Sequence, residues 1–395
     1  MPVAALSQST NNWIGTTPAY GTTTNWQNSA IPLSSETAVF STLGTARSLA
    51  IGTGTSVGGW QFSAGAPAYT FSVQNTYQFL TTGIVNSSSS APIVTVTATG
   101  DLNFSNSTSA GIATIRNAIS GAKTTFKDSA SAGTASLGNL TAGTSLIFQD
   151  TASAGSAAIT NTNGTVSFTG SASAGSASIT SSGPTGLASF SGSATAGSAT
   201  ITSGSGGKTS FTGSSTGGQA RLIANPGAFV DISGLATSGM TVGSIEGPGT
   251  YRLGSKQFTV GTNNIAGLVS GSIVDGGDSG GTGGSLVKTG TGTLILSGNS
   301  TYTGGTTISG GTLQIGNTGT TGSLLGNIVN NSALVFNRTN QTIVNNVISG
   351  TGTMQQNGTS LLLLTGANSY TGATIVSRPR CRSARAASWA RSRAT

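Results

Sequence analysis

The chain contains no histidine and a single cysteine, Cys381, among its 395 residues. One cysteine cannot form a disulfide within the chain, and zinc and copper sites rely on histidine and cysteine ligands. No apolar run approaches the roughly 18 residues that span a bilayer as a helix. We therefore predict no disulfide framework, no membrane-spanning helix, no metal site and no cofactor.

Charge is also scarce, because Asp, Glu, Lys and Arg make up 6% of the residues, against about 25% in ordinary soluble domains. The net charge of +8 is uneven: residues 1–376 carry 10 Lys or Arg and 8 Asp or Glu, and six further arginines lie in 377–395. Nucleic-acid binding through this tail is one alternative, but we expect no specific nucleic-acid partner.

The stretch GDSGG, residues 277–281, has the letters that surround the nucleophilic serine of chymotrypsin-like proteases. Such a serine needs a base to take its proton, and the chain has no histidine for this role. The nearest lysine in sequence, Lys288, lies nine residues after Ser279 and is therefore not in S-x-x-K spacing with that serine. We interpret the stretch as a glycine-rich turn between strands, with Ser279 as a turn residue, and we predict no catalytic residues.

From residue 104 onward a strict pattern recurs: Phe, six residues, Gly, one residue, Ala, one residue, then Ile or Leu. Successive phenylalanines are 22, 22, 20, 22 and 21 residues apart, and only the segment before each Phe changes length. The copies are Phe104/Gly111/Ala113/Ile115, Phe126/Gly133/Ala135/Leu137, Phe148/Gly155/Ala157/Ile159, Phe168/Gly175/Ala177/Ile179, Phe190/Gly197/Ala199/Ile201 and Phe211/Gly218/Ala220/Leu222.

Ala and Ile or Leu, two positions apart, give the alternation of a strand with one apolar face. A lone strand of this length cannot bury that face, whereas stacked repeats pair their backbones about 4.8 Å apart and align equal side chains in columns. We therefore predict an all-β fold, a right-handed parallel β-helix of roughly 20–22 residues per coil. Phe is expected to stack at one corner, with Ala and Ile or Leu filling the interior.

The second half keeps the coil length but changes its motif. GTL, GTL, SAL and GTM end at Leu294, Leu313, Leu334 and Met354, which are 19, 21 and 20 residues apart. A longer unit is superposed, because LILSGNSTYTGGTTI at 294–308 returns as LLLTGANSYTGATIV at 362–376. This offset matches Tyr302 with Tyr370.

The stretch GGSLVKTGTGTLILSGNSTYTGGTTISGGTLQIG resembles the autotransporter-associated β-strand repeat of bacterial surface proteins. Upstream, FTGSASAGSASIT is similar to stacked repeats in the passenger domains of these proteins, and NWQNSAIPLSSETAVF is similar to the start of many passengers. The resemblance covers roughly residues 12–376. It implies a β-helical passenger that is secreted and displayed at the outer membrane of a Gram-negative cell, with self-association or host and surface glycans as expected partners.

The family pattern also implies an N-terminal signal segment and a C-terminal outer-membrane β-barrel, and we identify neither in this chain. After Val376 the repeat changes abruptly into SRPRCRSARAASWARSRAT. We hypothesise a truncated or frameshifted passenger. The expected parts are a capping and entry region (1–90), a short-repeat β-helix (91–240), a β-helix with the autotransporter-associated repeats (241–376) and a basic tail, non-native or disordered (377–395).

Three tryptophans in the first part, Trp13, Trp26 and Trp60, have rings that can stack on sugars. A β-helix also needs its open end covered, because exposed strand edges recruit other chains. We therefore interpret these tryptophans as capping residues.

Acidic residues suggest two further sites. Asp275 and Asp278 carry oxygens suited to calcium, although the nonapeptide repeats of calcium-binding β-rolls are absent. Asp128 and Asp150 each follow a Phe by two residues, so we expect them one coil apart, near the spacing of a glycosidase carboxylate pair. The next two coils have glycine at that place. We assign turn or surface roles to all four.

The favoured function is a non-enzymatic surface passenger, adhesin-like or a structural stalk. The first alternative is an extracellular polysaccharide lyase or hydrolase, because β-helices often host such activities. The second is the nucleic-acid binder already described, which requires a genuine tail.

Resequencing the gene around codon 376 tests the reading-frame hypothesis. We expect the corrected frame to continue the repeat beyond Val376. Confirmation of the present frame, together with expression of the present tail, contradicts the hypothesis.

Overall fold

The computed structural model describes residues 8–52, 54–97, 99–377 and 381–383. The chain divides into two compact units, Met1–Gly218 and Gln219–Thr395, here called unit 1 and unit 2. Within the described residues the one helical element is a 3₁₀ turn, η1 (Thr23–Asn25). None of the helices in this part of the chain is long and apolar enough to cross a membrane.

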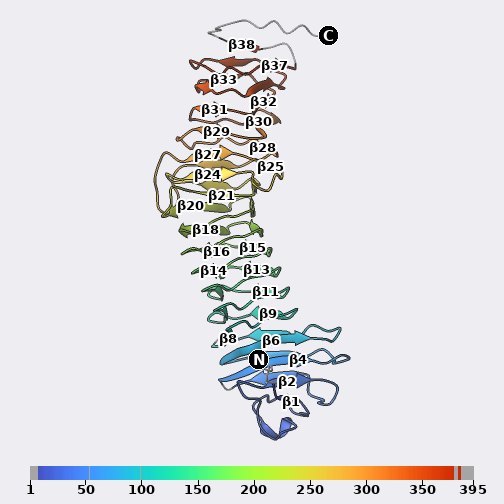
Figure 1. Ribbon diagram of the computed structural model, residues 1–395. Coiled ribbons are helices and arrows are strands. Elements are labelled where there is room, and N and C mark those ends of the chain that lie inside the picture. Colours follow the sequence, from blue (N-terminus) through green and yellow to red (C-terminus); the bar gives the residue numbers. More distant parts are fainter. Residues whose placement is uncertain (1–7, 53, 98, 378–380, 384–395) are drawn as a thin grey trace, which may run out of the picture. The chain divides into compact units, whose positions relative to one another are not determined.

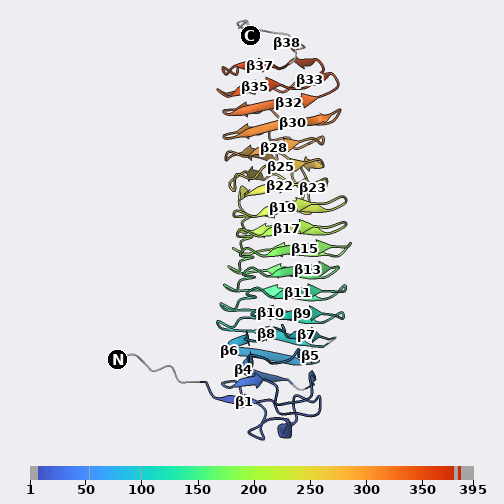
Figure 2. The same cartoon turned by 90° about the vertical axis from the view of Figure 1, so that its right-hand side faces the viewer.

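Unit 1 is a parallel β-solenoid in which successive coils contribute strands to two sheets in turn. Figure 1 shows β14 and β16 on one side of the coils and β13 and β15 on the other, and Figure 2 faces the second sheet. The first sheet contains, in order, β1 (Thr10–Asn12), β2 (Thr37–Phe40), β4 (Thr55–Phe62), β6 (Thr76–Asn86), β8 (Asp101–Phe104), β10 (Lys123–Phe126), β12 (Ser145–Phe148), β14 (Thr165–Phe168), β16 (Leu187–Phe190) and β18 (Lys208–Gly213). The second contains β3 (Ser48–Ile51), β5 (Thr70–Val73), β7 (Ile93–Val96), β9 (Thr114–Asn117), β11 (Ser136–Asn139), β13 (Ala158–Thr162), β15 (Ser178–Ser182) and β17 (Thr200–Ser203).

A third side of these coils is held by single bridges rather than by strands. One hydroxyl residue per coil pairs with its equivalent in the next coil. The bridged residues are Ser109, Ser131, Ser153, Ser173, Thr195 and Thr216. The predicted parallel β-helix is thus confirmed as a three-sided coil with two sheets.

The predicted phenylalanine column is confirmed. From Phe104 to Phe211 each ring lies opposite its equivalent in the next coil. The ring centroids are 4.6–4.9 Å apart and the ring planes differ by only 3–11°. These separations fall in the range of offset stacking, and they follow from the spacing of hydrogen-bonded coils.

The glycine of the repeat is explained by its backbone. Gly111, Gly133, Gly155, Gly175, Gly197 and Gly218 have φ of 57–62°, a left-handed conformation that other residues adopt at a cost. A Cβ at Gly175 would also lie 2.4 Å from the carbonyl oxygen of Gly155 in the previous coil. Any larger side chain would therefore be strained and would push the coils apart.

A buried polar column, which the sequence reasoning missed, runs beside the apolar ones. Asn117 Nδ2 donates to Asn139 Oδ1 (2.9 Å), and Asn139 Nδ2 donates to Asn161 Oδ1 (3.1 Å). Asn161 Nδ2 then donates to the hydroxyl of Ser181 (3.1 Å). Each amide also bonds the backbone carbonyl of the first residue of a strand in the first sheet, as Asn139 does with Thr165 O of β14 (2.8 Å). These bonds satisfy the buried amides and hold the turns in place.

Unit 2 is also built from parallel strands. Its sheets contain β20 (Phe229–Leu235), β23 (Thr250–Arg252) and β26 (Ser272–Val274); β19 (Arg221–Ala224) and β22 (Ser244–Glu246); β21 (Gly239–Val242), β24 (Gln257–Val260), β27 (Ser285–Lys288), β29 (Thr306–Ile308), β31 (Ile328–Asn330) and β34 (Ile348–Ser349); β25 (Gly267–Val269), β28 (Thr293–Leu296), β30 (Thr312–Gly319), β32 (Ala333–Arg338), β35 (Thr353–Gln356) and β37 (Thr374–Val376); and β33 (Thr342–Val344), β36 (Leu362–Leu364) and β38 (Cys381–Ser383).

The second repeat is confirmed in this unit, because Leu294, Leu313, Leu334 and Met354 pair in succession and are all buried. The equivalent Tyr302 and Tyr370 make the same local bond: each hydroxyl shares a hydrogen bond with the threonine four residues later, Thr306 (2.6 Å) and Thr374 (2.9 Å). The longer sequence unit therefore recurs as a structural unit.

Substitution of Phe168 by Ala tests the column. The ring is fully buried between two stacked neighbours, so its loss should lower the free energy of unfolding by about 3–5 kcal/mol. Denaturant titration followed by circular dichroism measures this. The matched control is Ser171→Ala at an exposed position of the same coil, for which we expect a change within about 0.5 kcal/mol. Equal effects of the two changes would contradict a column that carries the stability.

Candidate functional site

Ser279 lies in a hydrogen-bonded turn, as the sequence indicated. Gly280 N–H donates to Gly277 O (3.0 Å), and Gly276 N–H donates to Gly281 O (2.9 Å). The backbone N–H of Ser279 donates to the hydroxyl of Ser233 (3.1 Å), 46 residues earlier in the chain. The loop that carries GDSGG is thereby attached to strand β20.

Two carboxylates receive the N–H donors of this loop. Buried Asp231 accepts from Asp278 N (2.9 Å) and from the backbone and hydroxyl of Ser233 (2.9 and 2.7 Å). Asp275 accepts from Gly283 N (3.2 Å) and Gly284 N (2.8 Å). It also accepts from the hydroxyl and N–H of Thr303 (2.6 and 3.3 Å). These carboxylates act as internal anions that order a glycine-rich segment.

The hydrogen bonds that Asp275 accepts disfavour calcium binding at this carboxylate. N–H and O–H donors point at the oxygens of Asp275, where a cation would need free lone pairs. Asp278 lies 3.7 Å from the guanidinium of Arg252, measured from Oδ1 to Nη1. No group of three or more His, Cys, Asp or Glu suited to a metal occurs in the described part of the chain.

Asp128 and Asp150 lie one coil apart, as expected, but their carboxylates accept hydrogen bonds from backbone N–H groups. Asp128 N–H donates to Asp150 Oδ2 (3.0 Å), and Asn106 N–H donates to Asp128 Oδ2 (2.8 Å). Both aspartates have a left-handed backbone, with φ of 56° and 57°. The glycines in the next coils adopt the same conformation, which explains why both Asp and Gly occur at this turn position.

The three early tryptophans fill the core of the N-terminal end of unit 1. Each is at most 1% exposed, so no sugar can stack on these rings. Trp13 and Trp26 meet edge to face, with centroids 5.1 Å apart, in the segment before the regular coils. Trp60 lies on β4, where its indole N–H donates to the hydroxyl of Tyr77 (2.8 Å). The first two rings thus cover the end of the unit, while Trp60 belongs to the coil interior.

Lys288 occupies an inward position between Val260 and Ile308 of the adjacent coils. Its ammonium donates to the carbonyl oxygens of Thr289 (2.6 Å), Gly290 (3.2 Å) and Gly310 (3.1 Å). Burial lowers the pKa of this lysine because the charged form loses hydration. Lys288 therefore joins two coils through its hydrogen bonds.

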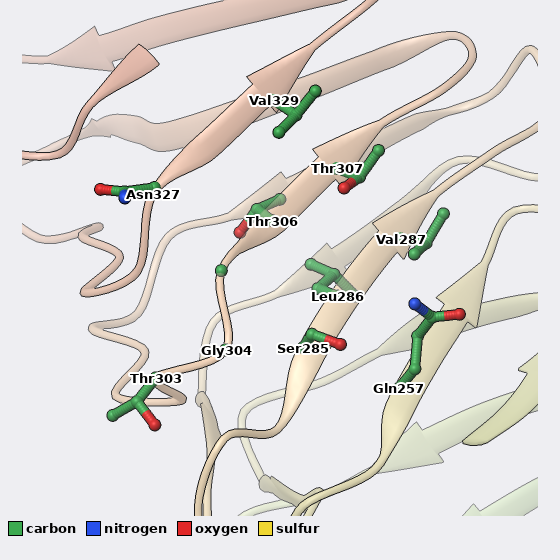
Figure 3. Close-up of a pocket in the computed structure, with 11 residues that line it drawn as sticks. Gln257, Ser285, Leu286, Val287, Thr303, Gly304, Thr306, Thr307, Asn327 and Val329 are labelled. Atoms are coloured by element: carbon green, nitrogen blue, oxygen red, sulfur yellow. The ribbon is translucent and has the colours of Figure 1, made fainter. Parts of the chain in front are cut away.

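The described surface of unit 2 has a shallow groove of about 290 Å³. It lies on the outer face of the sheet that contains β24, β27, β29 and β31. Figure 3 shows Val287, Thr307 and Val329 projecting from successive strands, with Thr303 and Asn327 on the loops at one side. Its lining residues are Gln257, Ser285, Leu286, Val287, Thr303, Gly304, Gly305, Thr306, Thr307, Asn327 and Val329. The lining contains amides, hydroxyls and methyl groups and no charged side chain.

The basic tail of the sequence analysis lies largely outside the described residues. The nucleic-acid alternative and the non-native or disordered character assigned to 377–395 therefore stay predictions. Within this segment the backbone of β38 pairs in parallel with β36.

Comparison with known proteins supports the resemblance noted in the sequence. The Passenger-associated-transport-repeat family matches residues 286–315 and 349–378. A stretch of 45 residues is 60% identical to the "Adhesin BmaC autotransporter" of Brucella suis biovar 1 (strain 1330). That match covers 11% of this chain and 1% of the relative. No solved structure matches the chain.

The described residues form a parallel β-solenoid, and two segments of unit 2 carry the matched repeat. These comparisons support an autotransporter passenger with passenger-associated transport repeats at residues 286–315 and 349–378.

Tyr302, in the first matched repeat, is expected to make the folding stability of the chain depend on pH. Burial raises the pKa of this phenol well above its usual value near 10. The unfolded chain therefore loses the proton first, so the stability that Tyr302 contributes is complete below about pH 10 and falls as the pH rises further. The loss is up to about 1.4 kcal/mol per pH unit.

Tyr302→Phe should flatten this decline, as measured by denaturant unfolding between pH 8 and 11.5. The matched control is Tyr370→Phe in the second copy, where the ring is half-buried. We expect Tyr302→Phe to change the slope more than the control does. Identical slopes for the parent chain and Tyr302→Phe would refute the assignment.

Proposed function

We propose that the chain is a non-enzymatic, surface-displayed passenger segment that acts as an adhesin-like stalk. The relative that shares the 45-residue stretch is an adhesin, and the repeat family is associated with passenger transport. The same comparison supports secretion to the surface of a Gram-negative cell as part of this proposal. Self-association and binding of host or surface glycans are the interactions that suit this role.

The observation that carries the proposal is a set of outward columns of hydroxyl residues that recur from coil to coil. In unit 1 the outward positions of the second sheet align Thr160, Thr180 and Thr202, and those of the first sheet align Ser167, Ser189 and Ser210. Many equal, weak contacts along a rigid support favour multivalent attachment over recognition at a single pocket. Each coil adds about 4.8 Å of length, so the same repeats provide spacing from the cell.

Cells that display the full chain can be compared with cells that lack it and with cells that display a chain shortened by two coils. Deletion of residues 149–190 joins Phe148 to Ser191, so that Phe148 meets Phe211 in the register that Phe190 now holds. We expect loss of the whole chain to abolish attachment or aggregation and the shortened chain to retain part of it. Flow-cell adhesion and sedimentation assays measure both.

The control is a second deletion of the same length that starts half a coil later. It removes residues 160–201 and joins Ile159 to Thr202. Both deletions should behave alike if the function is distributed over the coils. Unchanged surface properties without the chain, combined with loss of an extracellular hydrolytic activity, would overturn the proposal in favour of an enzyme.

A further inference from the structure

The groove on unit 2 is formed by two parallel columns of side chains. Ser285 pairs with Gln257, and the register places Gly305 between Ser285 and Asn327. Gly305 has φ of 88° and no side chain, and a Cβ there would lie 2.9 Å from the carbonyl oxygen of Asn327. The groove therefore has a bare stretch of backbone, here called the hollow, between the polar side chains of Ser285 and Asn327. The second column consists of Val287, Thr307 and Val329 in register. A ligand in the hollow would meet amides and a hydroxyl on one side and methyl groups on the other.

The polar groups of the groove are available. Within the described residues, no hydrogen bond to another protein group engages the side chains of Gln257, Ser285 or Thr307. Asn327 uses its Oδ1 to accept from Val347 N (3.1 Å), which orients its NH₂ group. These groups offer both donors and acceptors to a ligand.

The surroundings disfavour a charged ligand. The carboxylate of Asp275, behind Thr303, already accepts four hydrogen bonds from the protein. The ammonium of Lys288 faces inward and donates to three carbonyl oxygens. A charged group in the groove would lose hydration without gaining a partner of opposite charge.

An extended peptide is also disfavoured. Strand β29, at the centre of the groove, pairs with β27 on one side and β31 on the other. Its backbone groups are used, so a peptide strand has no free sheet edge to join. A neutral carbohydrate does not need such an edge, because its hydroxyls bond to side chains and its C–H faces lie against methyl groups.

We propose that this groove binds a neutral glycan, with Gln257, Ser285, Thr307 and Asn327 as hydrogen-bonding residues. Val287 and Val329 contact the apolar face of the sugar. A volume of about 290 Å³ is at the lower end of ligand sites, so the hollow takes a short segment of a longer saccharide that extends across the open sheet. The assignment rests on the proposed adhesin-like function, for which it names the ligand class.

Calorimetric titration of the full chain with neutral hexasaccharides tests the site. The probes are cellohexaose, xylohexaose and mannohexaose, with hexagalacturonate as the acidic comparison. We expect at least one neutral probe to bind and the acidic one to bind at least tenfold more weakly. Absence of binding by all three neutral probes, or preference for the acidic one, overturns the proposal.

Thr307→Arg places a large side chain at the centre of the groove and should weaken binding of the neutral probe at least tenfold. The matched control is Ser72→Arg, at an equally half-exposed outward position of the central strand β5 in unit 1, for which we expect unchanged affinity. Ser285→Ala should have a smaller effect, about two- to tenfold. Circular dichroism confirms folding of each variant, and equal affinities for Thr307→Arg and its control contradict the assignment.

Displayed on cells, the same pair of variants separates the two proposals. If adhesion requires the chain but Thr307→Arg leaves it intact, the stalk function stands and the groove assignment fails. If the purified chain binds a neutral probe through Thr307 but cells that lack the whole chain adhere as before, the groove assignment stands and the adhesin role fails.

Discussion

Parallel hydrogen bonding between equivalent residues of successive coils is the constraint on which the other features depend. Once Phe126 pairs with Phe148, and Leu137 with Ile159, every residue type that recurs with the coil period becomes a column. Apolar columns then exclude water, and polar ones must satisfy their own hydrogen bonds. The same spacing therefore selects ring stacking for Phe and an amide ladder for Asn.

The constraint also explains the composition. A solenoid turns sharply several times in each coil, and each turn must stack on the equivalent turn of the previous coil at the same spacing. Gly155 and Gly175 adopt the left-handed turn with almost no space between them, and Ser153 uses its hydroxyl to accept from the N–H of Gly155 (3.0 Å). Charged residues would stack into like-charged columns, which repel one another. Glycine, serine and threonine replace them.

The columns could be predicted from the sequence because each is a residue type that recurs at a fixed offset from Phe or from GTL. The asparagine ladder continues the same alternation two positions after Ile or Leu, at Asn117, Asn139 and Asn161, and this signal was overlooked because buried amides are uncommon. The partners of the GDSGG loop were beyond sequence reasoning. Asp231 and Ser233 lie 47 and 46 residues away from the groups that they bind, and no periodicity links them. The groove at Gly305 is formed partly by loop residues such as Thr303 and Asn327, in coils of unequal length whose loop positions the repeat does not predict.

Binding by such a fold uses the outward positions, because the inward columns of the described coils are filled by packed side chains such as Phe168, Leu286 and Lys288. The interior of unit 1 is closed by stacked rings, and Lys288 in unit 2 is held by carbonyl oxygens of its own turns. Outward positions are free to vary without disturbing the register, since a strand presents alternate residues to opposite faces. A hollow such as that at Gly305 can therefore arise on the outer face while the neighbouring inward column of Leu286, Thr306 and Ile328 stays buried. Stability and recognition can therefore use opposite sides of the same strands, so that a repeat whose inward residues hold the fold is still able to carry a local site on its outer face.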